Sequence, residues 1–350
     1  MTDFTVRDTG AVTAARLRAW VAEDFGVELG TVERVRLGAD ATAQLWRCVS
    51  IEGLAYAVKL SGVGTPAGLL VTAHLAQRGA RGIAAPVLTR TGAPYAGHDG
   101  RLLSMVPWLS GRRALDGGMT ERHWVSYGAV VAEVHESAPV DLLADDLPRE
   151  QHTHDEVAAA VRALDQLLAG ETRRAAADRD PLTAALAREW QAARERIAAV
   201  LGGADDLAAR LRDSGTPPVV VCHGDPHLGN LVLGEQGQVW LVDWDDTVLA
   251  PRERDLMFVL GGVLAFAPVT EEQQGWFFDG YGPVTPDPAL VAYYQCTRAL
   301  VDLADPAAEV LGVTRFSAGR REESLSVVRG VLSPTGLVDR ALASVRRLGG

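Results

Sequence analysis

Residues 223–230 read HGDPHLGN, and residues 242–246 read VDWDD. Asp225 and Asn230 are five positions apart within the first motif, and Asp243 follows Asn230 by thirteen positions. Two short apolar runs joined by the turn GEQG separate the motifs, and this pattern predicts a β-hairpin. Because a hairpin returns the chain, the three polar side chains are expected to converge at one end of it.

These side chains suit one kind of chemistry. A carboxylate and an amide oxygen are hard ligands of the kind that Mg²⁺ prefers, so Asn230 and Asp243 are candidate metal ligands. A second carboxylate, Asp225, is suited to accept the proton of a hydroxyl group. One base, two metal ligands and a cation on the nucleotide phosphates are what metal-assisted phosphoryl transfer requires.

The cation is predicted at Lys59, in the segment AVKL at residues 57–60. Among the 34 lysine and arginine residues, Lys59 is the only lysine. Tyr56, Val58 and Leu60 alternate with less apolar positions, which predicts a half-buried strand. An ammonium group there needs an anionic partner, and lysine offers a compact point charge where arginine offers a planar fork. The alternative is a single lysine left by chance.

Composition bounds the class of protein. The net charge of −11 argues against a nucleic-acid-binding surface and permits attraction of a cationic small molecule. Cys48, Cys222 and Cys296 lie far apart without CxxC spacing, so neither a disulfide framework nor a zinc site is expected. No leader or membrane-spanning run is apparent, so a soluble, cytoplasmic protein is expected. The oligomeric state stays open.

A chain of 350 residues is long for one compact core, which predicts two lobes. Their expected bounds are residues 1–107 and 108–350. In the first, helices are expected near 13–26 and 66–79 among about five short strands, which makes an α+β lobe. The second is expected to be mainly helical, with the catalytic motifs in a strand and hairpin region. Its expected helices and strands are 120–137, 155–170, 181–203, 219–222, 231–233, 239–242, 254–266 and 288–312.

The two motifs, with AVKL upstream, resemble those of the aminoglycoside phosphotransferases and related small-molecule kinases. Further segments are similar to spectinomycin phosphotransferases: LGADATAQ (37–44), the run from Leu241 to Gly262, and YGPVTPD with LVAYYQ after it. The resemblance covers most of the chain and is weakest between about residues 140 and 215. It implies a protein-kinase-like bilobal fold with a small, mostly antiparallel-sheet N-lobe and a larger, mainly helical C-lobe.

The resemblance implies a role for each matched residue. Asp225 would accept or orient the substrate hydroxyl, Asn230 and Asp243 would hold Mg, and Lys59 would contact the α- and β-phosphates of ATP, with GTP as an open alternative. The loop LGADATAQ would cover the phosphates with Gly38 and the backbone N–H groups of Ala41, Thr42 and Ala43. The histidines of HGDPHLGN would shape the loop and not bind metal.

The segment SMVPWLSG (104–111) is the expected link between the lobes. Adenine would bind the C=O of Val106 and the N–H of Trp108, with Pro107 between them because no N–H is needed there. Met105 and Trp108 would flank the purine. The alternative is a plain linker with a proline turn.

A cationic aminocyclitol would need carboxylates and flat apolar surface. Candidate substrate contacts are Asp246, Trp276, Tyr293, Tyr294, Asp302, Asp305 and Glu309. The tyrosines have a core position as their alternative role, because a tyrosine stripe on a helix is commonly buried.

One departure from kinases stands out. Kinases pair the strand lysine with a glutamate on the following helix, whereas TPAGLLVTAHLAQRG (65–79) has no acidic residue and Ala73 stands near the expected place. The partner of Lys59 is then either a residue from elsewhere, such as Asp243, or the nucleotide itself.

Three functions follow as hypotheses. The first is an ATP-dependent O-phosphotransferase acting on an aminocyclitol or aminoglycoside antibiotic, with spectinomycin as the leading substrate, for resistance or self-protection. The second is a kinase of another small alcohol: choline, homoserine, a sugar or a nucleoside antibiotic. The third is a non-catalytic nucleotide-binding pseudokinase, which the missing helix glutamate favours and the presence of Asp225 disfavours.

Overall fold

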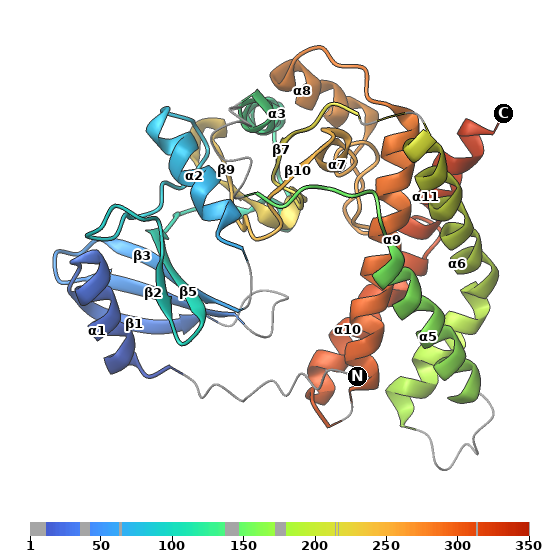
Figure 1. The fold of residues 1–350 in the computed structure, drawn as a ribbon, viewed down its shortest axis with the longest axis horizontal. Helices are drawn as coiled ribbons and strands as arrows, with labels where there is room; N and C mark the ends of the chain where they lie inside the picture. Colours follow the sequence, from blue (N-terminus) through green and yellow to red (C-terminus); the bar gives the residue numbers. More distant parts are fainter. Residues whose placement is uncertain are drawn as a thin grey trace.

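The computed structural model describes residues 12–35, 43–62, 65–136, 147–171, 180–213, 215, 217–312 and 314–349. Two lobes lie side by side, a sheet lobe built from the N-terminal part of the chain and a larger, mainly helical lobe (Figure 1). The predicted α+β class and two-lobe layout are confirmed. Within the described residues, no helix is both long and apolar enough to cross a bilayer.

The N-lobe is an antiparallel five-stranded sheet with strand order β1-β2-β3-β5-β4. One helix, α1, begins at the capping residue Thr13 and ends at Gly26, whose φ of 70° suits glycine. The other, α2, follows β3 directly in the chain. The elements are α1 (Ala14–Phe25), β1 (Leu29–Val35), β2 (Gln44–Ser50), β3 (Ala55–Ser61), α2 (Ala67–Gln77), β4 (Ala96–His98) and β5 (Arg101–Pro107).

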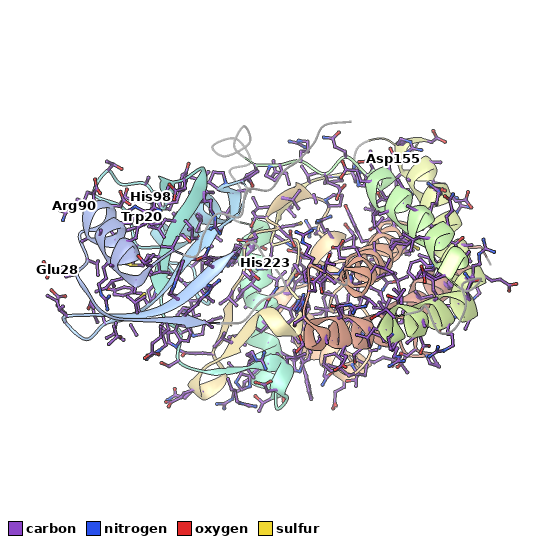
Figure 2. The ribbon with its side chains drawn as sticks, turned by 90° about the horizontal axis from the view of Figure 1, so that it is seen from below. Trp20, Glu28, Arg90, His98, Asp155 and His223 are labelled. Atoms are coloured by element: carbon purple, nitrogen blue, oxygen red, sulfur yellow. The ribbon has the colours of Figure 1, made fainter. Side chains whose placement is uncertain are left out.

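The inner face of this sheet forms the core of the N-lobe. Trp46, Val58, Leu103 and Met105 are buried on this face and pack with one face of α1. Trp20 of α1 stacks on His98 with 4.1 Å between ring centroids, at the far end of the lobe (Figure 2). The sheet ends at Pro107, where the boundary between the lobes was expected.

The C-lobe divides into a small-strand region and a helical region. Two short sheets, β10-β7 and β6-β8-β9, hold the motif segments, and His223 lies between the two lobes (Figure 2). The strands are β6 (Arg112–Arg113), β7 (Val220–Cys222), β8 (Leu231–Leu233), β9 (Val239–Leu241) and β10 (Val248–Ala250). The predicted hairpin is confirmed, with Leu231 opposite Leu241.

Helices enclose the strand region and form the largest core. The helices are α3 (Glu121–Glu136), α5 (Asp155–Glu171), α6 (Pro181–Asp213), α7 (Glu253–Leu256), α8 (Glu271–Tyr281), α9 (Pro288–Leu311), α10 (Ala318–Leu332) and α11 (Leu337–Leu348). The central one is α9, which packs against α5, α6, α10 and α11. It starts at the capping residue Asp287 with Pro288 in its first turn.

Two predicted helices differ from the observed ones. The helix expected at 254–266 is only the short α7, which ends at Leu256 and is followed by turns. Gly261 and Gly262, with φ values of 93° and 71°, prevent a helix from continuing through the rest of the expected range. The helix expected at 181–203 continues to Asp213 as α6, through two glycines. Its apolar face packs on α9, and this tertiary contact outweighs the low helix propensity of glycine.

Candidate active site

The first motif forms a loop after β7, and Asp255 of α7 holds this loop through hydrogen bonds to its backbone. The backbone N–H groups of His223 and Gly224 each donate to the Asp255 carboxylate at 2.8 Å. Asp255 is 1% exposed and also contacts His135 Nε2 at 3.1 Å, while His135 Nδ1 pairs with the Tyr281 hydroxyl at 2.7 Å. The Asp255 carboxylate therefore fixes the start of the loop that carries Asp225.

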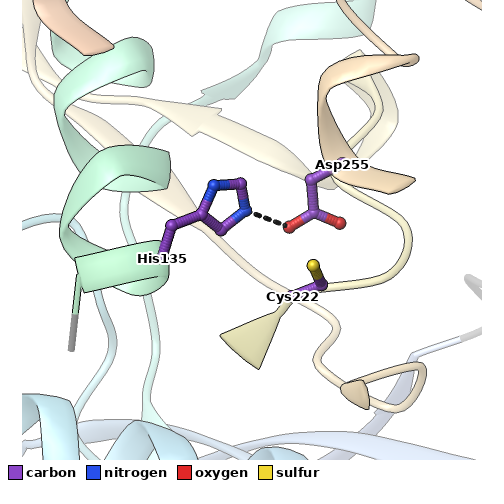
Figure 3. Close-up of side chains that lie close together, drawn as sticks. All are labelled: His135, Cys222 and Asp255. Atoms are coloured by element: carbon purple, nitrogen blue, oxygen red, sulfur yellow. Dashed lines mark hydrogen bonds and ion pairs between the residues drawn. The ribbon is translucent and has the colours of Figure 1, made fainter. Parts of the chain in front are cut away.

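His135, Cys222 and Asp255 converge in the core, with candidate ligand atoms within 4.8 Å of one another (Figure 3). The hydrogen bonds indicate a structural role. The Cys222 thiol faces the carbonyl oxygens of Ala250 and Pro251, and burial raises its pKa well above the usual range, so the thiol stays protonated. The polar atoms of the other two side chains are paired with each other, with the Tyr281 hydroxyl and with the loop backbone, so this cluster supports the loop.

Two histidines shape the loop as neutral side chains. His223 Nδ1 accepts the Asp225 N–H at 3.2 Å, so its Nε2 is the donor to the Val242 carbonyl at 3.1 Å. His227 Nδ1 accepts the Gly229 N–H at 2.8 Å. Burial lowers the pKa of both, to about 4 for His227. Both histidines therefore support the loop through hydrogen bonds, in agreement with the prediction.

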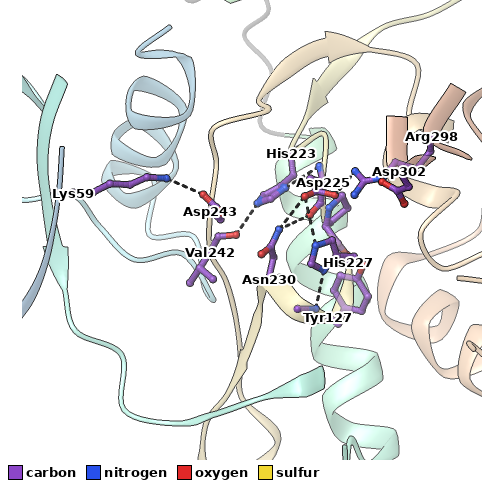
Figure 4. A network of polar contacts seen from close by, with 12 residues as sticks. Lys59, Tyr127, His223, Asp225, His227, Asn230, Val242, Asp243, Arg298 and Asp302 are labelled. Carbon is purple, nitrogen blue, oxygen red and sulfur yellow. Dashed lines mark hydrogen bonds and ion pairs between the residues drawn. The ribbon is translucent and has the colours of Figure 1, made fainter. Parts of the chain in front are cut away.

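Asp225 sits at the centre of the polar network that runs between the lobes (Figure 4). Arg298 Nη1 lies 2.6 Å from its Oδ1, and Asn230 Nδ2 lies 3.3 Å from its Oδ2 and 2.9 Å from its carbonyl oxygen. Burial raises the pKa of Asp225 to about 6, opposed by Arg298 and reinforced by Asp246. A carboxylate with this pKa is well matched to proton transfer near neutral pH.

Arg298 was not predicted from the sequence, and it joins α9 to the catalytic loop. Its Nε lies 2.7 Å from Asp302, one turn further along the helix, and its Nη1 reaches Asp225. The two carboxylates raise the pKa of the guanidinium although burial opposes this, so it remains charged. Asp302, expected to bind substrate, is instead the second partner of Arg298.

Lys59 reaches across from β3 to the segment after β9. Its Nζ lies 2.9 Å from Asp243 Oδ1 and 2.6 Å from Asp245 Oδ2. Burial alone would lower the pKa of Lys59, but the two carboxylates raise it, so the ammonium is charged. In the structure, Lys59 is paired with protein carboxylates, which are one of the two kinds of partner that the sequence left open. Asp243 was a candidate, and Asp245 was not.

Asn230 and Asp243 fit the prediction of a magnesium site. The amide nitrogen of Asn230 is used by Asp225, which leaves its Oδ1 as an acceptor, and Val242 N–H bonds the Asn230 carbonyl at 3.0 Å. Asp243 has a φ of 65° and a half-exposed side chain, of which only one oxygen contacts Lys59. An amide oxygen and a carboxylate oxygen are therefore presented on either side of Val242 (Figure 4).

The predicted adenine contacts need a correction of one residue. Trp108 N–H donates to the Ala55 carbonyl at 2.9 Å, so Ala57 and Val106 are the next hydrogen-bonded pair of the antiparallel ladder. The Val106 C=O and Trp108 N–H therefore point into the sheet. The C=O of Pro107 and the N–H of Leu109 point away from β3 and have no partner among the described residues.

The side chains expected to flank the purine are also placed differently. Met105 is 0% exposed in the N-lobe core, and its carbonyl accepts the Val87 N–H at 2.8 Å. The Trp108 ring lies 5.6 Å from the Arg47 guanidinium. In the predicted phosphate loop, Gly38, Ala41 and Thr42 lie outside the described residues, and Ala43 directly precedes β2.

The predicted substrate contacts separate into two groups. Tyr293 and Tyr294 are 1% and 2% exposed in the C-lobe core, so both take their alternative role as core residues and are not placed to contact substrate. Trp276 of α8 is partly buried and packs against the core around the short strands, and Glu309 pairs with Arg320 of α10 at 2.8 Å. Asp246 and Asp305 are exposed and stay candidates.

The fold and the arrangement of this site are those of a kinase-like phosphotransferase: a sheet lobe with a strand lysine, and a helical lobe that carries the loop of Asp225 and the acidic segment after β9. The profile of the phosphotransferase enzyme family matches residues 69–300, more than half of the chain, and the protein belongs to this family. No curated protein sequence gives a match.

Solved structures share the fold. A spectinomycin phosphotransferase, APH(9)-Ia, in complex with ADP and spectinomycin aligns with a TM-score of 0.81 at 23% identity, over 96% of this chain and 99% of that one. Its AMP complex aligns with a TM-score of 0.78 at 22% identity, over 95% and 99% of the two chains. An amicoumacin kinase gives 0.62 at 17% identity, over 93% and 95%. The predicted kinase-like bilobal fold is thus confirmed.

Proposed function

We propose that this protein is an ATP-dependent O-phosphotransferase that transfers the γ-phosphoryl group to a hydroxyl of a small cationic molecule. The observation that carries the proposal is a pair of contacts from the two lobes: Lys59 is bonded to Asp243, and Asn230 is hydrogen-bonded to Asp225 (Figure 4). The two pairs are linked by the backbone hydrogen bond from Val242, which precedes Asp243, to the Asn230 carbonyl. Each group has one task in phosphoryl transfer. Asp225 would have no task in a protein that only binds nucleotide.

In this account, Asp225 accepts the proton of the substrate hydroxyl, and Asn230 and Arg298 orient its carboxylate. Lys59 binds the nucleotide phosphates. Asn230 and Asp243 would hold magnesium, which neutralises charge on the phosphates when bound. The Pro107 C=O and the Leu109 N–H are the proposed adenine contacts, because the sheet leaves these two groups free.

Spectinomycin is the first substrate to test. Support comes from the alignment over nearly the full length of a protein that binds it, and from the exposed carboxylates Asp246 and Asp305, which suit a cationic ligand. The identity of 23% leaves other alcohols open. An arginine beside Asp225 also favours substrates whose positive charges lie away from the reacting hydroxyl, since like charges repel.

The test is ADP formation with ATP, magnesium and a panel of alcohols: spectinomycin, other aminoglycosides, choline, homoserine, a sugar and a nucleoside antibiotic. We expect ADP formation that depends on one cationic antibiotic. Turnover of choline or homoserine alone would replace the substrate class and keep the kinase. Nucleotide binding without transfer to any acceptor would favour the non-catalytic alternative.

A further inference from the structure

The partner of Lys59 does not come from α2, the helix that follows its strand. Kinases hold this lysine with a glutamate of the helix that follows its strand. Here that helix is α2, with the sequence AGLLVTAHLAQ and no acidic residue. Lys59 is instead held by the segment between β9 and β10, at 2.6 Å by Asp245 and at 2.9 Å by Asp243.

Gly68 explains how this segment reaches the lysine. A Cβ atom at Gly68 would lie 2.1 Å from the carbonyl oxygen of Trp244 and 2.6 Å from its Cβ. The backbone of α2 therefore packs directly on Trp244, the residue between the two aspartates. A larger residue at this position of the helix would push the segment away from β3.

Hydrogen bonds within the segment between β9 and β10 also fix the position of Trp244. The Trp244 ring N–H donates to the Leu241 carbonyl at 3.1 Å, and the Thr247 hydroxyl donates to the Trp244 carbonyl at 2.7 Å. Trp244 is 9% exposed. These contacts fix the backbone on both sides of Asp245, so its carboxylate is held at a defined position and not on a free loop.

We propose that Asp245 is the positioning residue for Lys59 and takes the place of the absent helix glutamate. This inference rests on the proposed function. Two carboxylates face one ammonium group, and Asp243 is the one expected to serve the metal. Asp245 is then the carboxylate that keeps Lys59 directed at the phosphates when Asp243 is engaged elsewhere.

The single lysine makes a direct observation of this ion pair feasible. Protein labelled with ¹⁵N only in lysine gives one side-chain ammonium resonance, that of Lys59. In ligand-free protein at fixed pH, we expect a protected Lys59 signal in the wild type and a loss or marked broadening in Asp245→Asn. The matched control is Asp246→Asn, the next residue, which has no ion pair with Lys59 and is judged only by this signal. An unchanged signal in Asp245→Asn would overturn the proposal.

Kinetics separate positioning from a structural role. We expect Asp245→Asn to lower kcat/KM for ATP about tenfold, the usual size for loss of a charge-assisted hydrogen bond. Asp245→Glu is expected to restore most of that loss, because the side chain is half exposed and has room. The melting temperature is expected to stay unchanged, since half-exposed ion pairs contribute little stability. A wild-type kcat/KM in Asp245→Asn, or a loss explained by unfolding, would contradict the assignment.

The two proposals fail separately. If Asp245→Asn releases the Lys59 signal but no acceptor is ever phosphorylated, the ion pair stands and the proposed function fails. If the wild type phosphorylates an acceptor and Asp245→Asn matches it in both signal and kcat/KM, the proposed function stands and the role of Asp245 fails.

Discussion

At the scale of single residues, the chemistry depends on how Asp225 is charged. Burial favours its neutral form, and Arg298, 2.6 Å away, favours the ionised form. The balance leaves a pKa of about 6, so the carboxylate is ionised above this value and ready to accept a proton. Arg298 is in turn shared with Asp302, which tempers its pull on the base.

The pH dependence tests this balance. In the proposed mechanism the ionised carboxylate is the active form, so kcat/KM is expected to fall as pH drops through about 6. Arg298→Gln removes the group that lowers the pKa, so the acid limb is expected to move to higher pH. The control Arg329→Gln removes an arginine paired with Glu189 far along the chain and should leave the limb in place. An acid limb that moves to lower pH in Arg298→Gln would contradict the assignment.

At the scale of elements, the site depends on how α2 packs on the segment after β9. Gly68 meets Trp244 with backbone against backbone, and Lys59 meets the two aspartates that flank this contact. Because Gly68 has no side chain, α2 can pack closely on Trp244 and leave Asp243 and Asp245 within reach of Lys59. The same principle applies at Gly224, where a Cβ atom would lie 2.1 Å from the Asp246 carbonyl oxygen.

Gly68→Ala is expected to destabilise the protein by about 1–3 kcal/mol, the usual range for an overpacked site, because backbone atoms have to move. It should also weaken nucleotide binding by displacing Asp243 and Asp245 from Lys59. The control is Gly275→Ala in α8, where nothing lies within 4 Å and alanine should stabilise the helix. Thermal unfolding and nucleotide titration of both variants measure the difference. Equal stability of the two variants would show that the contact is not tight.

The elements were predictable where local pattern decides them. The hairpin with GEQG, the strand holding Lys59 and the long helix α9 follow from periodicity and turn residues. The hinge register was not predictable, because a strand pattern does not tell which alternate carbonyl groups face the neighbouring strand. Arg298 had no signal either, since only the packing of α9 brings it to Asp225. Asp245 had one signal, the run of aspartates in DWDD, but the sequence does not tell which of them faces Lys59.

At the scale of the whole molecule, Lys59 links the two lobes through its ion pairs with Asp243 and Asp245. Nucleotide is expected to bind at this link, between the end of β5 and the catalytic loop. The predicted kinase-like bilobal fold is confirmed, with Lys59 on the sheet of one lobe and Arg298 on the long helix α9 of the other. The tyrosines of α9 were misassigned because core packing and substrate contact give the same sequence pattern.

Binding at the link should be visible in thermal stability. A ligand present at about 100 times its Kd stabilises a folded protein by about 2.7 kcal/mol, so ATP with magnesium is expected to raise Tm clearly. Lys59→Arg keeps the charge but replaces a point charge by a fork and is expected to remove most of this shift. A full shift in Lys59→Arg would mean that the lysine has no specific part in nucleotide binding.

The most direct test is transfer of the γ-phosphoryl group of ATP to spectinomycin, followed by ³¹P NMR for the wild type and Asp225→Asn. The account predicts a new phosphomonoester resonance with the wild type and a rate lower by at least about a hundredfold in the variant, the usual contribution of a general base. Phosphomonoester formation at the same rate in both proteins would contradict it.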